Sequence, residues 1–269
     1  MDLQGKIAVV TGSASGIGRA CAVEFASRGC DVVVADIHEE RLKETAALVE
    51  SQGRRALVVL CDVGSDEQVD ALRRRTTAEF GRADLVMSNV GILAMGLPHT
   101  LPMEQWQRVI DVNLLGTVRM LNTFVPEMVE RGSGHFVTTA STAGLFPYSF
   151  TRLPYAASKY AVVGISEGLA LYLGPQNIGV SCLCPAAVPS NIAEQITVLG
   201  EVPRMQSPPL RTVEADEVGR LVADAVQQNR FLVLTDPAAL DHMRARAADP
   251  DAFLASQVAF LQQRVDPRR

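Results

Sequence analysis

Short apolar segments alternate with helical segments along most of the chain. The segments 6–12, 31–36, 55–63, 83–91, 134–141, 178–185 and 230–236 are short and rich in β-branched residues, which predicts buried strands. The segments 16–28, 39–52, 66–80, 103–131, 155–173 and 214–228 carry apolar residues at helical spacing. The helix over 103–131 is expected to bend or break near Gly116 and Pro126. The alternation predicts an α/β fold, a doubly wound parallel sheet with helices on both faces.

The length and composition fit one globular domain. The chain has 269 residues, 48% of them hydrophobic, and a net charge of −5, which gives no reason to expect a nucleic-acid partner. Its apolar runs are too short to span a bilayer, so no membrane partner is expected. The five cysteines form no metal-ligand pattern and suggest reduced, buried thiols in a cytoplasmic protein. Residues 1–269 are therefore predicted to form one domain, with a loop region at about 190–212 and a helical tail at about 237–269.

A glycine-rich turn follows the first predicted strand. The segment TGSASGIG places Gly12, Gly16 and Gly18 between a strand and a helix. Glycine allows a tight turn and lets the backbone approach a pyrophosphate, while the helix start presents free N–H groups. A plain tight turn is the alternative interpretation. The context favours dinucleotide binding, with Ser15 and Ile17 also in contact with the cofactor.

The second predicted strand ends in Asp36, 20 residues after Gly16. A carboxylate at this position accepts hydrogen bonds from the adenosine ribose and repels the 2′-phosphate of NADP. The next residues, Ile37 and His38, are neither arginine nor lysine, and position 13 of the glycine turn is serine. These features predict NAD (NADH) as the cofactor. A helix cap or turn residue is the alternative role for Asp36.

Tyr155 and Lys159 lie four residues apart at the start of a predicted helix, so they share one face. A phenol is a poor base at neutral pH, and a nearby ammonium is expected to lower its pKa. Tyr155 can then exchange a proton with an alcohol or ketone while hydride moves to or from a nicotinamide. Ser141 ends the fifth predicted strand and can donate a hydrogen bond to the substrate oxygen. Asn113 is a polar residue inside a helical segment.

Together these residues resemble the short-chain dehydrogenase/reductase family in its single-domain form. The resemblance rests on TGSASGIG at 11–18, SNVG at 88–91, the series Asn113, Ser141, Tyr155 and Lys159, and PAAVPS at 185–190. It implies a Rossmann-type fold, an acid–base role for Tyr155 and a water relay at Asn113. It also implies a homodimer or homotetramer. The cofactor contacts that it implies are Asp62 and Val63 at the adenine, Asn89, Val90 and Gly91 along the cofactor, Lys159 at the nicotinamide ribose, and Pro185, Val188 and Ser190 at the carboxamide.

The chain departs from the family pattern at several positions. Ser88 and Val90 stand where the family usually has asparagine and alanine, and Ala186 replaces the usual glycine. Ser141 and Tyr155 are separated by one residue more than is common. The C-terminal segment also differs from the family's frequent ending, which leaves the oligomer interface open.

The substrate is less clearly indicated. Leu93, Leu145, Phe146 and Phe150 follow strand ends near Ser141 and Tyr155, which suggests a hydrophobic alcohol or ketone, although core packing is the alternative for several of them. Arg152 is the nearby charge before Tyr155 and would suit an acidic substrate. Two rival functions remain. A nucleotide-sugar epimerase or dehydratase is disfavoured by the glycine spacing and the length, and a non-catalytic NAD(H) sensor or interaction protein is disfavoured by the intact catalytic side chains.

Overall fold

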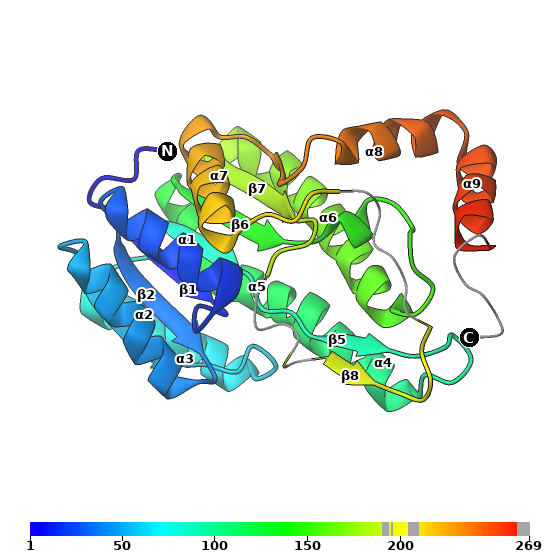
Figure 1. Cartoon of the computed structure of the whole chain (residues 1–269). Helices are drawn as coiled ribbons and strands as arrows, with labels where there is room; N and C mark the ends of the chain where they lie inside the picture. Colours follow the sequence, from blue (N-terminus) through cyan, green and yellow to red (C-terminus); the bar gives the residue numbers. More distant parts are fainter. Residues whose placement is uncertain (190–193, 195, 204–209, 263–269) are drawn as a thin grey trace.

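The computed structural model describes residues 1–189, 194, 196–203 and 210–262. Its centre is a seven-stranded parallel sheet in the order β3-β2-β1-β4-β6-β7-β9, which confirms the predicted fold class (Figure 1). The strands are β1 (Ile7–Thr11), β2 (Asp31–Asp36), β3 (Ala56–Leu60), β4 (Leu85–Ser88), β6 (Gly134–Thr139), β7 (Ile178–Cys184) and β9 (Leu232–Leu234). The chain moves outward from β1 to β3 and then returns to the other side of β1 at β4. In open α/β sheets, ligands bind beyond the carboxyl ends of the strands at such a reversal.

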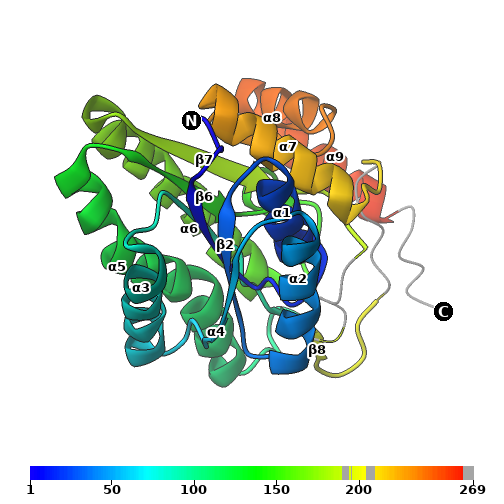
Figure 2. The same cartoon turned by 90° about the vertical axis from the view of Figure 1, so that its left-hand side faces the viewer.

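Helices cover both faces of the sheet (Figure 2). On one face lie α1 (Gly16–Ser27), α2 (Glu39–Ser51) and α7 (Ala215–Gln228), whose apolar residues join one core cluster with alternate residues of β1 and β2. On the other face, α3 (Asp66–Phe80), α5 (Gly116–Arg131) and α6 (Leu153–Leu173) form a second cluster with the intervening strand residues. Burial on both faces explains why the strands read as continuous apolar runs.

The segment predicted as one helix over 103–131 is divided. It contains α4 (Met103–Ile110), a π-helical turn over Asp111–Leu115 and α5, so the expected break near Gly116 is confirmed. No break occurs at Pro126, because α5 runs through it. The neighbouring Val125 and Met128 are buried and hold the helix in place, while Pro126 itself faces outward. The chain therefore stays helical at Pro126, where a bend or a break was expected.

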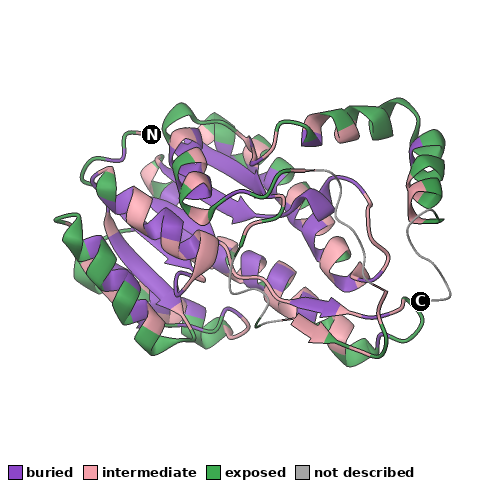
Figure 3. Cartoon of the chain, viewed as in Figure 1, coloured by how far each residue is buried: buried purple, intermediate pink, exposed green. Residues whose placement is uncertain are grey.

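Two short strands were not predicted. β5 (Leu93–Met95) and β8 (Ile196–Val198) pair in parallel beside the main sheet. The tail forms two helices, α8 (Ala239–Ala248) and α9 (Pro250–Gln262), which extend away from the sheet and expose most of their residues (Figure 3). Short 3₁₀ turns occur at Thr142–Gly144 and Gly174–Gln176. Within the described part of the chain, no helix is long and apolar enough to cross a membrane.

Candidate active site

A large cavity opens at the carboxyl edge of the sheet, where the strand order reverses. Its volume is about 1010 Å³. Its lining includes most of the residues that the sequence predicted for the cofactor: Gly12, Ser15, Gly16, Ile17, Asp36, Ile37, Asp62, Val63, Asn89, Val90, Gly91, Tyr155, Lys159, Pro185 and Val188. Of the predicted substrate contacts, Leu93, Ser141 and Tyr155 also line it. Ser190, another predicted cofactor contact, lies outside the described residues.

The glycine turn allows close packing at the edge of the cavity. Gly12 and Gly16 have φ angles of +67° and +52°, which side chains with a Cβ rarely adopt. Gly18 does not line the cavity. A Cβ there would lie 2.1 Å from the backbone oxygen of Gly12, so its role is to let α1 pack against the end of β1. The backbone at the start of α1 can therefore face a phosphate group.

Asp36 is held at the end of β2 by backbone donors. Its Oδ1 accepts hydrogen bonds from Ile37 N at 2.7 Å and His38 N at 3.2 Å, and its Oδ2 accepts one from Ala14 N at 3.2 Å. These bonds fix the carboxylate beside the glycine turn. Oδ2, which accepts one of these bonds, retains a lone pair for a ribose hydroxyl.

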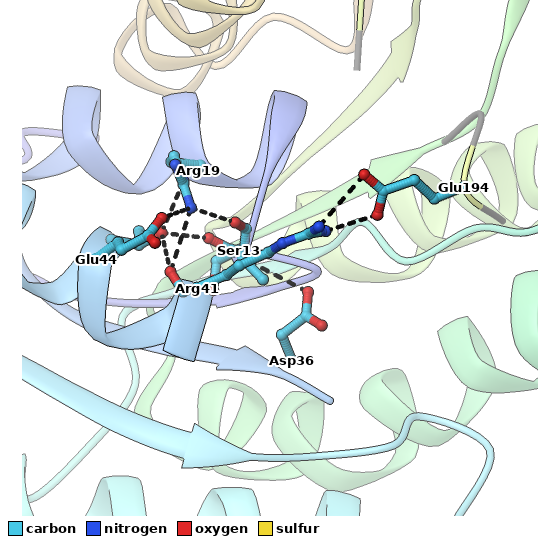
Figure 4. Close-up of polar contacts among 8 residues, drawn as sticks. Ser13, Arg19, Asp36, Arg41, Glu44 and Glu194 are labelled. Atoms are coloured by element: carbon cyan, nitrogen blue, oxygen red, sulfur yellow. Dashed lines mark hydrogen bonds and ion pairs between the residues drawn. The ribbon is translucent and has the colours of Figure 1, made fainter. Parts of the chain in front are cut away.

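Two arginines surround this corner of the cavity (Figure 4). Arg19 donates to Ala14 O at 2.6 Å and pairs with Glu44 at 2.9 Å, which ties the glycine turn to α2. Arg41 of α2 pairs with Glu194 at 2.8 Å. Glu194 precedes β8 and lines the cavity, so this ion pair connects α2 to the cavity wall next to β8. The interaction raises the pKa of Arg41.

Asn89 and Thr139 connect three strand ends. The amide of Asn89 donates to Thr11 O at 3.2 Å, and Thr139 Oγ1 donates to Asn89 Oδ1 at 3.1 Å. The carbonyl oxygen of Thr139 accepts a hydrogen bond from Lys159 Nζ at 2.8 Å. β1, β4 and β6 are thereby linked to the lysine on α6.

Tyr155, Ser141 and Lys159 meet at the end of β6. The structure corrects the expected pKa of Tyr155. Burial raises it to about 12, while a hydrogen bond with the Ser141 side chain and the positive charge of Arg152 act in the opposite direction. Lys159 Nζ lies 5.5 Å from the centre of the Tyr155 ring and bonds to Thr139 instead. The ammonium was expected to act directly on the phenol, but the positive charge that lowers the pKa of Tyr155 is that of Arg152, and burial has the larger effect.

Lys159 is itself buried. Desolvation lowers its pKa to about 8, and the thiols of Cys182 and Cys184 on β7 oppose this shift. These two cysteines share a face, as predicted from their spacing, with 3.8 Å between their sulfur atoms. All five cysteines are free and buried.

Asn113 lies in the π-helical turn and does not line the cavity. Its amide donates to Ile92 O at 3.0 Å and Ser158 Oγ at 3.0 Å, and its Oδ1 accepts from Ile92 N at 2.8 Å. A polar side chain in this helix is therefore explained by its bonds to the loop after β4. Those bonds hold the loop after β4 against α6, the helix that carries Tyr155.

Comparisons with known proteins fit this geometry. The family model described as short chain dehydrogenase matches residues 6–198. The chain belongs to the short-chain dehydrogenase family. Among its relatives, the (2S)-[(R)-hydroxy(phenyl)methyl]succinyl-CoA dehydrogenase subunit BbsD of Thauera aromatica is 36% identical, over 70% of this chain and 75% of the relative. An NAD-dependent oxidoreductase of Mycobacterium tuberculosis is also 36% identical, over 72% of this chain and 75% of the relative.

Solved structures agree with the family assignment. A short-chain dehydrogenase/reductase from Burkholderia phymatum in complex with NAD superposes with a TM-score of 0.83 at 33% identity, covering 94% of this chain and 96% of that chain. A levodione reductase superposes with a TM-score of 0.76 at 26% identity, covering 87% of this chain and 97% of that chain. The match extends well beyond the glycine turn into the C-terminal part of this short-chain dehydrogenase.

Three predicted substrate contacts of this short-chain dehydrogenase do not line the cavity: Leu145, Phe146 and Phe150. Leu145 and Phe146 are buried in a core cluster with Phe253 of α9. Phe146 stacks on His242 of α8 at 4.8 Å between ring centres, so the tail helices cover this side. The turn that contains Phe150 presents Tyr148 and Arg152 to the cavity instead.

Several lining residues were missed as site residues: Gln105, Val109, Tyr148, Ile196, Thr197 and Leu210. They come from α4, the loop before α6, β8 and the segment before α7. Arg152, which the sequence indicated as a charge near Tyr155, also lines the cavity. The missed residues carry no local sequence signal.

The departures from the family pattern are accommodated. Ser88 donates to Thr117 Oγ1 at 3.1 Å, and Val90 packs against the core cluster on the α3–α5–α6 face. The backbone N–H of Ala186 donates to Thr235 Oγ1 at 2.9 Å, and Ala186 lines the cavity. None of these residues displaces Ser141, Tyr155 or Lys159 from the cavity.

Proposed function

We propose that this short-chain dehydrogenase is an NAD(H)-dependent oxidoreductase that interconverts a secondary alcohol and a ketone on a hydrophobic small molecule. One observation carries the proposal. A single cavity is lined by the glycine turn and Asp36 at one end and by Ser141, Tyr155 and Lys159 at the other. A dinucleotide and an acid–base group belong together in an enzyme that moves a hydride and a proton.

The residues present fit a dinucleotide. Gly12 and Gly16 have positive φ angles, which allow the tight turn that a pyrophosphate needs, and Asp36 Oδ2 has a free lone pair beside the turn. We assign NAD over NADP because Asp36 would repel a 2′-phosphate, and two of the similar proteins are described with NAD. Asp62, Val63, Asn89, Val90, Gly91, Pro185 and Val188 would contact the rest of the cofactor. When bound, NAD accepts the hydride from the alcohol carbon.

The chain's own residues handle the proton. Tyr155 Oη removes the hydroxyl proton of the alcohol, or returns it to the ketone in the opposite direction. Ser141 donates a hydrogen bond to the substrate oxygen and also interacts with Tyr155. With a pKa of about 12, the phenol of Tyr155 is neutral near pH 7. A positive charge close to the phenol oxygen is therefore needed before Tyr155 can act as an effective base. Lys159, fixed by Thr139, supplies part of that charge and would bind the nicotinamide ribose.

The test is NADH formation by purified protein with NAD and a panel of secondary alcohols, run alongside Tyr155→Phe. The substitution is expected to lower kcat/KM at least about 1000-fold, because it removes the group that transfers the proton. Tyr172→Phe, an exposed tyrosine of the same helix, is the matched control. Activity that survives in Tyr155→Phe contradicts the mechanism. NADH binding without turnover of any alcohol would favour the sensor function.

We further propose a homodimer or homotetramer in the cytoplasm. Leu171 and Tyr172 of α6 are 81% and 59% exposed, and Tyr172 lines a shallow groove with Leu121 and Val129 of α5. Exposed apolar groups of this kind support a contact between copies of the chain. Sedimentation equilibrium of the wild type and of Leu171→Glu tests the assembly, and a monomeric wild type contradicts it. The five free, buried cysteines support a reducing compartment, which cell fractionation checks.

A further inference from the structure

Arg152 has no polar partner in the described part of the chain, although it is half-buried. It lies directly before α6, three residues ahead of Tyr155, and lines the same cavity. Its Nε is buried without a hydrogen-bond partner. Its guanidinium carbon lies 5.4 Å from the centre of the Tyr148 ring. That stacking contact orients the planar group and satisfies none of its five N–H donors.

Arg54 provides the internal comparison. It too has a buried Nε without a partner, but its NH2 group forms an ion pair with Asp31 at 2.8 Å. Arg108, which also lines the cavity, is exposed to water. Arg41 and Arg119 have carboxylate partners, Glu194 and Asp111. Among the arginines that the structure describes, Arg152 combines partial burial, a place on the cavity wall and the lack of any carboxylate. A partly buried cation without a partner is stabilised by an anion, so this part of the cavity suits an anionic group.

The place of Arg152 decides which bound molecule supplies this anion. The glycine turn that would hold the cofactor phosphates follows β1, whereas Arg152 stands at the start of α6, next to Tyr155 and Tyr148. In the sheet order, β4 separates β1 from β6. Arg152 therefore belongs to the part of the cavity where the substrate carbon meets Tyr155. The anion is part of the substrate.

The chemistry of the surroundings narrows the class. Leu93, Val109, Ile196 and Leu210 line the cavity and present hydrocarbon surface. A single guanidinium matches one carboxylate through two parallel hydrogen bonds. Arg152 directly precedes α6, Tyr155 lies in the first turn of α6, and both line the same cavity, so we expect a short carbon chain between the carboxylate and the reacting carbon.

We propose that Arg152 binds the carboxylate of the substrate, and that the substrate is a hydroxy acid or its keto acid on a hydrocarbon skeleton. This inference rests on the proposed function, since it names the substrate class for the same site. The charge of Arg152 also acts on the acid–base group, because it lowers the pKa of Tyr155. When Arg152 pairs with an anion, its effect on the pKa of Tyr155 becomes weaker. The contact that recognises the substrate carboxylate therefore also affects proton transfer at Tyr155.

The first experiment measures binding without reaction. Protein saturated with NAD is titrated by calorimetry with 3-, 4- and 5-oxohexanoate and with the three corresponding amides. Ketone and NAD are both oxidised, so no hydride can move. At least one acid is expected to bind at least tenfold more tightly than its amide. Arg152→Met should bring the two affinities together, Arg152→Lys should keep part of the difference, and Arg220→Met, an exposed arginine of α7, should keep all of it.

The second experiment measures turnover of 3-, 4- and 5-hydroxyhexanoate and their amides with NAD. A wild-type preference for the acid in kcat/KM that disappears in Arg152→Met supports the inference. NADH affinity and thermal unfolding of each variant show whether it is folded. The inference is overturned if the wild type binds every amide as tightly as its acid, or if the preference survives in Arg152→Met.

The two proposals can fail separately. Arg152-dependent binding of an oxo acid, without oxidation of any alcohol, leaves the carboxylate site standing and contradicts the dehydrogenase. Tyr155-dependent oxidation of neutral alcohols, with no difference between acids and amides, leaves the dehydrogenase standing and contradicts the carboxylate site.

Discussion

The two halves of the cavity are built in different ways. The half that would hold the cofactor is made of strand ends and the glycine turn, fixed by hydrogen bonds such as those from Asn89 to Thr11 and from Ala14 to Asp36. The half around Tyr148 and Arg152 is assembled from loops and from β8, held largely by apolar packing. A sheet edge fixes its groups through the register of its strands. Loops can change their side chains while the sheet stays the same.

The largest expected effect lies in the cofactor half. Gly18→Ala would place a Cβ 2.1 Å from Gly12 O, a backbone atom that cannot move without opening the turn. We expect the dissociation constant of NADH to rise at least about 100-fold, or about 2.8 kcal/mol. NADH fluorescence titration measures it. Gly164→Ala is the matched control, because nothing lies within 4 Å of a Cβ at that exposed position of α6. Normal NADH binding by Gly18→Ala would contradict the view that close backbone packing fixes the cofactor half.

The second prediction concerns Lys159, which stands where the halves meet. Its folded-state pKa is about 8 and its ordinary value is 10.5, so between these values the unfolded chain binds a proton that the folded chain does not. Stability from this group therefore rises with pH across that window, by up to about 3 kcal/mol. Denaturant unfolding from about pH 8 to about pH 10 should show the wild type gaining stability relative to Lys159→Met. Relative to Lys43→Met, a substitution at an exposed site, the wild type should show no such gain in stability. Parallel curves for wild type and Lys159→Met would contradict the prediction.

Asp36 sharpens the comparison at the cofactor end. Asp36→Ser removes the carboxylate that repels a 2′-phosphate, so NADH should bind about tenfold more weakly and NADPH more tightly, a difference of about 1.4 kcal/mol for NADH. Fluorescence titration with both cofactors measures the ratio. Asp70→Ser on α3, whose side chain is 43% exposed and does not line the cavity, should leave the ratio unchanged. An unchanged NADH to NADPH ratio in Asp36→Ser would exclude Asp36 as the selecting group.

The smallest effect is expected at the ion pair between Arg41 and Glu194, which crosses from one half to the other. Both side chains are exposed, at 37% and 52%, so water and salt screen the interaction. Glu194→Gln should raise the KM for NAD about two- to threefold, and the effect should shrink at high salt. Glu40→Gln, which breaks the exposed pair with Lys43, is the control. An effect that is independent of salt would mean that Glu194 acts by another route.

Sequence patterns predicted the cofactor half because its residues depend on local order. A strand, a glycine turn and a helix follow one another, and the parallel sheet brings the strand ends together at Asp36 and Asn89. The same reasoning placed Ser141, Tyr155 and Lys159 in one cavity. The carboxyl ends of parallel strands lie at the same edge of the sheet, whatever loops join the strands.

The substrate half was predicted poorly for a physical reason. Leu145 and Phe146 follow a strand end, as a pocket residue would, but the tail helices pack on them, and periodicity cannot reveal which helix will cover a loop. Ile196 and Leu210 reach the cavity from far along the chain. The pKa of Tyr155 was misjudged because burial depends on the assembled fold, whereas the spacing to Lys159 is visible in the sequence.

Thr139 has a consequence for redesign of this enzyme. Its hydroxyl and its carbonyl serve opposite sides of the cavity, one through Asn89 and the other through Lys159. The spacing between the cofactor end and the proton-transfer group is thus set by one residue of a central strand. The loop before α6 and the segment around β8 lie outside this pair of hydrogen bonds. An engineer can therefore exchange the segment around β8 to change which molecules are accepted, whereas a change at Arg152 in the loop before α6 also alters the charge that acts on Tyr155.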